Sequence, residues 1–557
     1  MSILKKLNIV FSLVSILITI ASSAQVQKEK AGADDNTFYK RPKLVVGVVV
    51  DQMRYDYLVR FNDKYVDGGF RRLLKDGFSF TNANYNYVPT YTACGHTCVY
   101  TGTTPSHNGI VSNDWFNRYT KSNTYCVSDT TVSSLGTTSI SGKMSPVNLL
   151  TTTIGDELKL ATNFRSKVLG IALKDRGSIL TAGKGADAAY WHDPYSNNFV
   201  TSTYYMNALP TWVEDFNHRK VADSLLANPW TTLLPIEQYT ESSPDDSPYE
   251  GIFKGETKPV FPHNLPALKT ENSELIRDVP FGNTLTKEFV FSAIQAEKMG
   301  KGSETDFLAI SFTSTDYVGH MFGVNAIETE DTYLRLDRDI ADLLRFLDNY
   351  VGKDEYLLFL TADHGAVTNP VFNDDHRMTG EFYEGTSVMD SLKSELKRVY
   401  GEGNFILSRS TQNIYLDRDL IASKKIKLEE IQNRIAAFIS NFEGVSAAMT
   451  ATELQKGIER TGVYEFMQNG FNPQRSADVI VQLQPGWISW STKTGTTHGS
   501  AYRYDTHVPM IYFGKNVHSG NSATPVNITD IAPTISTFLN IEFPSGNTGV
   551  PLQDWLK

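Results

Sequence analysis

Residue types that bind metal ions recur at the ends of apolar segments along this chain of 557 residues. The segment Tyr356–Thr361 is followed by Ala-Asp-His-Gly, which places Asp363 and His364 side by side before a glycine. Alone, this pair could be ordinary polar residues of a turn. Because other apolar segments also end in ligand-type residues, we predict that the pair belongs to a metal site.

Three further segments supply the same residue types. Asp51 follows an apolar segment, where it could also cap a helix. Asp316 and His320 lie four residues apart, so a helical turn would place both side chains on one face. His498 lies in a loop beside a glycine, where a lone histidine is more often a solvated surface residue than a ligand.

Threonines in the segment Val-Pro-Thr-Tyr-Thr-Ala-Cys precede a predicted helix, and each could simply cap it. A hydroxyl at a helix N-terminus is also well placed to attack a phosphate, since the helix dipole favours an anion there. The pKa of a Thr92 hydroxyl is too high for unaided ionisation, and metal coordination would lower it. Asn113 follows in a predicted turn, where its amide could donate to a phosphoryl oxygen or simply form the turn.

Together these segments offer three Asp, three His and one Thr oxygen, which is enough for two metal ions. Sulfur is absent from the set, and mixed nitrogen and oxygen ligation is typical of catalytic zinc. Two metal ions ~3.5–4 Å apart can hold both the attacking and the leaving oxygen of an in-line displacement. The ligand set therefore predicts phosphoryl transfer.

The elements that must position these residues alternate between apolar strands and helical patterns. We predict strands at Leu44–Val50, Val168–Leu173, Phe307–Phe312, Tyr356–Thr361, Val479–Gln482 and Met510–Phe513. Helices are predicted at Phe289–Met299, Asp331–Leu347, Ser391–Tyr400 and Leu428–Asn441. Such alternation indicates an α/β fold with a largely parallel central sheet sandwiched between helices. Ligands bind at the carboxyl ends of the strands in these sheets, which is where the candidate residues lie.

We expect residues 41–557 to form a single α/β domain with insertions at about 185–285 and 400–475. The first insertion is rich in Tyr, Trp, Asn, Pro and Ser, and we expect it to cap the active-site end of the sheet. Residues 25–40 are polar and are predicted to form a flexible mature N-terminus.

Residues 1–24 are predicted to be a signal peptide. Lys5 and Lys6 precede an apolar stretch, and Ser-Ser-Ala24 fits a cleavage site after Ala24. The stretch Leu7–Ile20 would span only about 21 Å as a helix, less than the ~30 Å core of a bilayer. We therefore expect a periplasmic or secreted protein that has no membrane association after cleavage.

Composition limits the partners. The net charge of −10 and the absence of a basic stretch argue against nucleic acid as a dedicated partner. The three cysteines, Cys94, Cys98 and Cys126, are too few for a disulfide scaffold, and which pair could bridge stays open. We expect a monomer that acts on small molecules.

At these residues the chain resembles the alkaline phosphatase superfamily of two-metal hydrolases. More narrowly, it is similar to bacterial phosphate-irrepressible alkaline phosphatases with a threonine nucleophile. The resemblance runs from about Arg41 to Gly549-Val-Pro-Leu552 and includes Thr529-Asp-Ile-Ala-Pro-Thr534. It implies a zinc-dependent enzyme that hydrolyses phosphate monoesters through a phosphothreonine.

The resemblance also implies a role for each candidate residue. One zinc ion would be held by Asp51, Thr92, Asp363 and His364, and the second by Asp316, His320 and His498. Thr92 would be the nucleophile, and the phosphate would be bound by Asn113, Lys174 and Arg176. As a bare sequence, Lys174-Asp-Arg176 would be a solvated turn. Within this set, Arg176 can donate to two phosphoryl oxygens and Lys174 can add a point charge.

The main alternative is a nucleotide pyrophosphatase/phosphodiesterase, which would share the ligands and the nucleophile. Two fixed cations suit a dianionic monoester better than a singly charged diester, which favours the monoesterase. A sulfatase would need a Cys/Ser-x-Pro-x-Arg segment that Cys94 and Cys98 do not supply. A phosphoglycerate mutase conflicts with the signal peptide. A binding module with a structural metal has support only from the aromatic-rich insertion.

Overall fold

The computed structural model describes residues 40–410 and 412–556, in which the chain from Pro42 onward forms one compact unit. The predicted signal peptide, residues 1–24, and the polar residues 25–39 lie outside the described residues. Among the described helices, none combines the length and apolar character needed to cross a membrane. All three cysteines are described, and each is buried and free of a disulfide.

A central sheet of ten strands organises the fold, in the order β17-β2-β16-β11-β1-β10-β7-β8-β9-β6. Its middle strands run parallel and are β11 (Tyr356–Thr361), β1 (Leu44–Val50), β10 (Asp306–Phe312), β7 (Val168–Ala172) and β8 (Ala188–Asp193). Outer strands are β17 (Gly520–Ser522), β2 (Phe78–Phe80), β16 (Met510–Gly514), β9 (Asn198–Ser202) and β6 (Ser134–Leu135). Every residue of β1, β10 and β11 is buried, as expected for β-branched and apolar strands covered on both faces. The predicted α/β class with a largely parallel sheet is confirmed.

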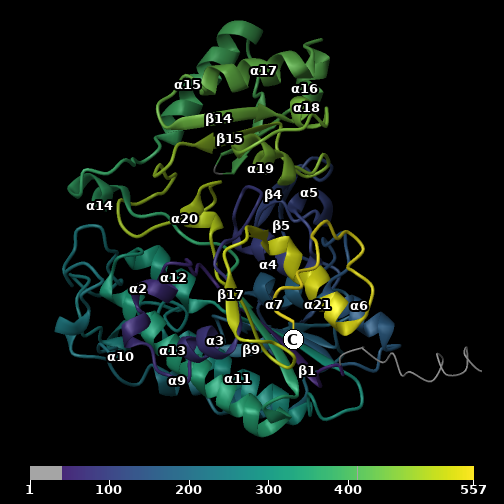
Figure 1. Ribbon diagram of the computed structural model, residues 1–557. Coiled ribbons are helices and arrows are strands. Elements are labelled where there is room, and N and C mark those ends of the chain that lie inside the picture. The colour runs from purple at the N-terminus through teal and green to yellow at the C-terminus, as the bar shows by residue number, and fades with distance from the viewer. Residues whose placement is uncertain (1–39, 411, 557) are drawn as a thin grey trace, which may run out of the picture. The chain divides into compact units, whose positions relative to one another are not determined.

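Helices cover the two faces of this sheet (Figure 1). One layer contains α4 (Thr92–Thr101), α6 (Ile154–Ala161), α7 (Asp175–Ala182) and α21 (Ile531–Leu539). The opposite layer contains α3 (Phe70–Asp76), α11 (Phe281–Ala296), α12 (Ser314–Phe322) and α13 (Ile327–Leu347). Both predicted helices that fall in the second layer are present, with earlier starts than the sequence pattern indicates.

The register of the parallel strands brings their carboxyl ends to one edge. Val50 of β1 lies opposite Phe312 of β10, and Val49 lies opposite Thr361 of β11. The segments that follow these strands therefore leave the sheet side by side. They carry the candidate ligands, and the segment after β7 carries Lys174 in the same way.

A second, antiparallel sheet has the strand order β12-β13-β15-β14. Its strands are β12 (Ile406–Ser410), β13 (Asn413–Leu416), β14 (Val445–Thr450) and β15 (Val479–Leu483), and it packs with α15 (Gly385–Tyr400) and α17 (Leu428–Ile439) around its own core. We call residues 385–483 the small module. In Figure 1 it lies beyond the carboxyl edge of the central sheet.

Two strands differ from the sequence expectation. Val479–Gln482 was expected to join the central sheet and instead forms β15 of the small module, because Val479 and Val481 are buried against its helices. β16 does join the central sheet but runs antiparallel to β11. The apolar pattern predicts a strand without identifying its neighbour, which long-range packing decides.

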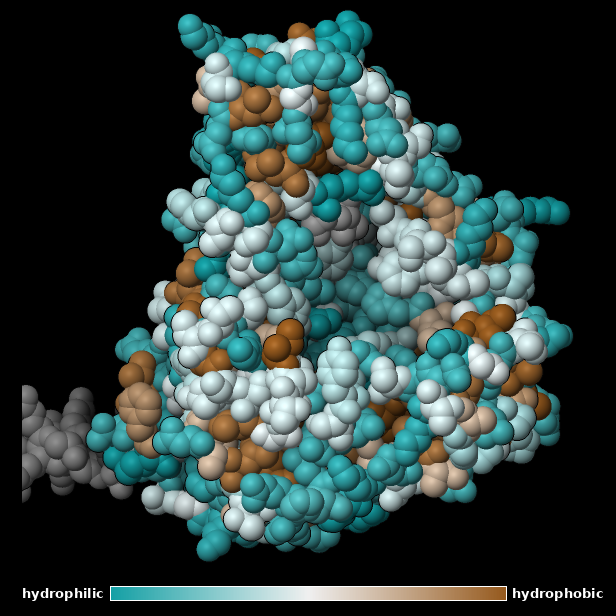
Figure 2. Space-filling model, turned by 180° about the vertical axis from the view of Figure 1, so that it is seen from behind, coloured by the Kyte–Doolittle hydropathy of each residue, from teal (hydrophilic) through white to brown (hydrophobic). Residues whose placement is uncertain are grey.

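The predicted first insertion, 185–285, is divided in the structure. Its first strands, β8 and β9, extend the central sheet, while α8 (Thr211–His218) and α9 (Val221–Leu225) pack on α11. Seen from behind in Figure 2, the surface is hollowed below the small module, and mostly hydrophilic residues surround the hollow.

Candidate active site

Two groups of ligand-type side chains meet at the carboxyl edge of the central sheet. Asp51, Asp363 and His364 form one, and Asp316, His364 and His498 form the other, with ligand atoms in each group within 4.8 Å of one another. His320 joins the second group, because its Nε2 lies 3.2 Å from Asp316 Oδ1. The six Asp and His residues singled out in the sequence are thus brought together. His364 lies between the two groups, whereas the resemblance assigns it to one.

The first group is built like a cation site. His364 Nε2 lies 3.3 Å from Asp363 Oδ2 and 3.6 Å from Asp51 Oδ1. These three atoms are buried and have no hydrogen-bond partner in the part of the chain that the structure describes. Buried acceptors without partners are costly, and three that converge are satisfied together by one metal ion. The residues therefore fit a metal.

The three histidines are oriented by backbone carbonyls. The Nδ1 atom lies 2.8 Å from Thr496 O in His320, 2.7 Å from Thr90 O in His498 and 2.9 Å from Gly365 O in His364. A carbonyl can only accept, so Nδ1 carries the proton in each ring. The Nε2 lone pair is left for a metal ion, as in most histidine metal ligands.

Burial and neighbouring charges set the protonation of the site. Burial lowers the pKa of His364 and, together with His364 and His320, holds the pKa of His498 well below its ordinary value. Burial and the nearby carboxylates of Asp316 and Asp363 raise the pKa of Asp51 well above its ordinary value. The imidazoles of His364 and His498 are therefore neutral, as metal ligands must be, and the crowded carboxylates need positive charge.

Lys174 joins the two groups. Its Nζ donates to Asp51 Oδ2 at 2.7 Å and to Asp316 Oδ2 at 2.5 Å, and the residue is only 4% exposed. Burial opposes the charged form, but Asp316 and Asp51 raise the pKa of the ammonium, so it stays protonated. An ammonium has three donors, so one remains for a bound anion.

Thr92 is the first residue of α4 and is buried. The helix can approach because it has Gly95 where it crosses the Asp363 backbone, and a Cβ there would collide with Asp363 O. Asn113 accepts from Ala93 N through Oδ1 at 2.9 Å, and among the described residues no hydrogen bond from its NH2 group is found. Asn113 thus lies beside the start of α4, as its predicted role requires.

Arg176 lies in α7, two residues after Lys174. Its Nη1 donates to Tyr125 Oη at 3.1 Å, while Nε is buried without a partner among the described residues. Arg176 and Lys174 line a pocket of about 170 Å³ together with Tyr125, Tyr317 and Arg277. The guanidinium therefore has donors available on the same side as the Lys174 ammonium.

Two residues of the site were missed by sequence reasoning. Gln52 donates through its backbone N–H to Asp363 Oδ1 at 3.1 Å and through Nε2 to Asp316 Oδ1 at 2.8 Å. The buried His96 donates from Nδ1 to Thr92 O at 2.9 Å, with the same nitrogen 3.2 Å from Asp363 Oδ2, and its Nε2 lies 2.8 Å from Ser311 Oγ. Both were visible as signals: Gln52 follows Asp51, and His96 lies one helical turn after Thr92.

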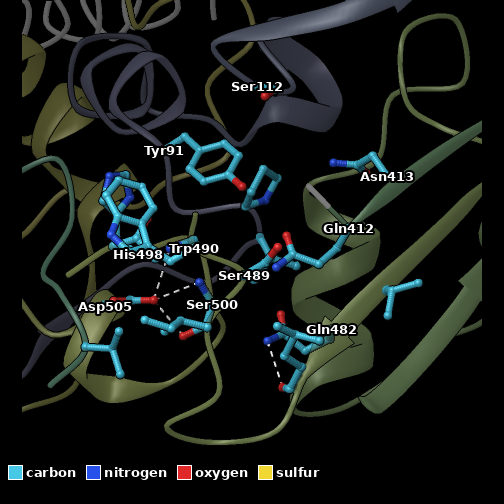
Figure 3. Close-up of a pocket in the computed structure, with 18 of the residues that line it drawn as sticks. Tyr91, Ser112, Gln412, Asn413, Gln482, Ser489, Trp490, His498, Ser500 and Asp505 are labelled. Atoms are coloured by element: carbon cyan, nitrogen blue, oxygen red, sulfur yellow. Dashed lines mark hydrogen bonds between the residues drawn. The ribbon is translucent and has the colours of Figure 1, made fainter. Parts of the chain in front are cut away.

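A cleft of about 280 Å³ opens beside the second group. One wall comes from residues outside the small module, namely Tyr91, Asn113, His320, Trp490 and His498. The facing wall comes from the small module, with Gln412, Asn413 and Gln482 (Figure 3). The first insertion, expected to cap this end of the sheet, contributes no residue to this cleft among those described, although Trp191 and Arg277 line the smaller pocket.

Known proteins resemble this chain over nearly its whole length. The family described as type I phosphodiesterase / nucleotide pyrophosphatase matches residues 45–507. A protein of Myroides odoratus named calcium-transporting ATPase is 46% identical over 522 residues, which cover 93% of this chain and 95% of the relative. The alkaline phosphatase PafA of Elizabethkingia meningoseptica is 45% identical over 526 residues, which cover 94% of this chain and 96% of the relative.

A solved structure agrees with these similarities. The crystal structure of wild-type alkaline phosphatase PafA matches with a TM-score of 0.90 and 44% identity, and the match covers 93% of this chain and 99% of that one. The region matched by the family contains every candidate ligand from Asp51 to His498.

Proposed function

Because this chain belongs to the type I phosphodiesterase / nucleotide pyrophosphatase family, within the alkaline phosphatase superfamily, we propose that it hydrolyses phosphate monoesters through a phosphothreonine on Thr92. It is a phosphatase, with 45% identity to one alkaline phosphatase over 94% of its length. One observation carries the proposed mechanism: partnerless acceptor atoms of Asp51, Asp363 and His364 converge beside the start of α4. We infer that a metal ion bound to these atoms would lie next to the Thr92 hydroxyl.

Metal dependence fits both the family and the two ligand groups. We propose two zinc ions, one held by Asp51, Thr92, Asp363 and His364 and the other by Asp316, His320 and His498. When bound, the ions supply positive charge that lowers the pKa of the attacking hydroxyl and stabilises the charge on the leaving oxygen. Manganese or cobalt would also accept this donor set, so the choice of zinc is tested by metal analysis.

The protein's own groups account for the remaining chemistry. The Thr92 oxygen attacks phosphorus in line, and the bond from phosphorus to the leaving alcohol oxygen breaks. The free donors of Asn113, Lys174 and Arg176 bind the non-bridging oxygens, with the positive end of the α4 dipole beside them. Water then attacks the phosphothreonine, releasing phosphate and restoring the Thr92 hydroxyl.

A phosphodiesterase is the closest alternative, since the matched family includes enzymes of that name. Two cations, the buried Lys174 and the partly buried Arg176, favour a dianionic group over a monoanionic one. We expect kcat/KM to be higher for 4-nitrophenyl phosphate than for bis(4-nitrophenyl) phosphate. The opposite order would show that the chain is primarily a diesterase.

Replacement of the nucleophile tests the covalent step. Thr92→Ala should lower kcat on the order of 10³- to 10⁶-fold, because removal of a nucleophile removes the intermediate. Thr92→Ser keeps a hydroxyl and should retain much of the activity. Mass spectrometry of acid-quenched enzyme should find phosphate on residue 92 in wild type and none in Thr92→Ala. Unchanged hydrolysis by Thr92→Ala would remove Thr92 from this role.

The Myroides odoratus relative suggests a second activity, ATP-driven calcium transport. ATP ends in a phosphoryl group that the proposed site would also cleave, so ATP hydrolysis alone does not separate the two functions. Calcium uptake into sealed vesicles during ATP hydrolysis would favour transport. ATP hydrolysis that is accompanied by no uptake would favour the phosphatase.

We also propose that the chain is exported and acts as a monomer in the periplasm or outside the cell. The motifs of residues 1–24 support export. N-terminal sequencing of exported protein should begin at Gln25, and light scattering should give the mass of one chain. An intact N-terminus on the exported protein would contradict cleavage after Ala24.

A further inference from the structure

The cleft and the smaller pocket are lined by different residues of the proposed reaction centre. His320 and His498, which we assign to the second metal ion, line the cleft together with Asn113. Lys174 and Arg176 line the smaller pocket instead. An in-line displacement expels the leaving oxygen opposite the attacking one, on the side of the second metal ion. The leaving alcohol therefore faces the cleft.

Aromatic rings form the part of the cleft nearest the metal ligands. The Trp490 ring stacks on His320 with 5.2 Å between centroids and 13° between planes, and its Nε1 donates to Thr494 O at 3.0 Å. The Tyr91 ring meets His498 edge-on, with centroids 5.6 Å apart. Both rings are thus held in place by the site itself. They offer rigid surfaces on which a ring of the leaving group could pack.

Side-chain amides form the facing wall. Asn413, the first residue of β13, and Gln412 just before it face Tyr91 and Trp490 across the cleft (Figure 3). Gln482 of β15 lies below them and donates to Leu483 O at 3.0 Å. An amide both donates and accepts, so this wall suits hydroxyls, sugars and heterocyclic edges.

The charged residues that line the cleft also discriminate between leaving groups. Among the described residues that line it, none is Lys or Arg, while Asp114 and Asp505 are both present. One carboxylate oxygen of Asp505 accepts from Ser500 and Gly499, and the other, Oδ1, is buried without a partner in the described chain. A second negative charge on the leaving group would find no cation here. It would also lie near two carboxyl groups.

We propose that the cleft binds the leaving alcohol and selects neutral, ring-bearing alcohols, such as sugars and nucleosides, over alcohols that carry a second negative charge. This inference rests on the proposed function, because it requires a monoester at Thr92. It gives the small module a role in substrate recognition, since that module supplies the amide wall. The proposed catalytic residues lie at the carboxyl edge of the central sheet.

Two aryl phosphates of nearly equal size isolate the effect of charge. The leaving group of 3-carbamoylphenyl phosphate is neutral, and that of 3-carboxyphenyl phosphate is anionic. Wild-type, zinc-loaded protein should have a kcat/KM about fivefold higher for the carbamoyl compound, the size of one partly exposed charge interaction. Asn413→Lys should shift the ratio about fivefold toward the carboxyl compound. Gln412→Lys is a second variant in case the first does not fold.

A matched control separates the cleft from general charge effects. Ser391→Lys adds the same charge to an exposed position of α15 in the small module and should leave the ratio unchanged. The proposal is overturned if both cleft variants melt like wild type and keep the wild-type ratio, or if Ser391→Lys shifts it equally. If wild type hydrolyses neither probe nor 4-nitrophenyl phosphate, the proposed function fails as well.

Discussion

Replacing Lys174 by Gln tests whether a fixed cation sets the preference for monoesters. The ammonium bridges Asp51 and Asp316 and is only 4% exposed, so its remaining donor acts where water screens little. Gln keeps a donor, is one bond shorter and removes the charge. The phosphoryl group of a monoester has two negative charges and that of a diester has one, so the two substrates should respond differently.

The size of the effect follows from the bond that is lost. A hydrogen bond to a charged group is worth about 1.5–3 kcal/mol, which is about 10- to 150-fold in kcat/KM. We expect Lys174→Gln to lower kcat/KM for 4-nitrophenyl phosphate by this factor. The loss for bis(4-nitrophenyl) phosphate should be below about tenfold, because the diester has one charge fewer.

Lys159 offers a matched control for the loss of a buried lysine. It is 3% exposed and donates to Ser166 O and to Asp187, away from the ligand groups. Lys159→Gln should lower the melting temperature and leave the ratio of monoester to diester activity unchanged. Both variants are assayed at saturating zinc with the bound metal measured, because Lys174 also neutralises two ligand carboxylates.

An unchanged ratio in fully metal-loaded Lys174→Gln would refute this explanation of specificity. A fall in both activities by the same factor would show that the lysine only organises Asp51 and Asp316. In that case Arg176 or the shape of the site would have to discriminate against diesters.

Further predictions concern a residue that supports a candidate metal ligand, the pH dependence of stability, and the removal of metal. Asp505 accepts from the backbone N–H groups of Gly499 and Ser500, next to His498, so Asp505→Asn should lower kcat/KM about 10- to 100-fold, with weaker zinc binding by calorimetry. Burial opposes the charged form, but His263 donates to the carboxylates of Glu256 and Glu328, and these hydrogen bonds raise its pKa from 6.5 to about 9. A raised folded-state pKa stabilises the fold below the unfolded value, and this stability is lost as pH rises through about 9. His263→Gln should therefore cost up to about 3 kcal/mol in urea unfolding near pH 6 and much less near pH 10, and an equal cost at both would contradict the linkage. Chelation of the metal should lower the melting temperature and abolish turnover, because it leaves buried carboxylates unpaired. Added zinc should restore both. A melting temperature that chelation does not change would count against metal binding in the folded protein.

The sequence pattern was sufficient to predict the centre of the fold and the candidate ligands that the structure brings together. The apolar runs before Asp51 and Asp363 are long, β-branched or aliphatic, and end at polar residues, so strand ends and ligands are marked together. Asp316 and His320 carry a helical spacing, and α12 has that spacing in the structure. Local signals of this kind can be recognised without knowledge of the tertiary packing.

Other features depend on contacts between distant segments. β15 has the same apolar character as the central strands, and only its packing against the small module decides its sheet. The spacing of His96 from Thr92 marks it as a candidate only, and its contact with Asp363 appears only when α4 lies against the end of β11. Gln412 and Tyr91 likewise face each other across the cleft, although they are more than three hundred residues apart in the sequence. No local pattern encodes such pairs.

The carbonyls that orient the three histidines have a consequence for how this site can vary. His320, His364 and His498 are held by main-chain oxygens of Thr496, Gly365 and Thr90 rather than by side chains. A main-chain oxygen is present whatever residue occupies the position. Substitutions at Thr90 and Thr496 can therefore accumulate without changing which nitrogen each imidazole presents, as long as the loop path is kept. The orientation of the three imidazoles therefore depends on the path of the backbone. The neighbouring side chains can change as the substrate changes.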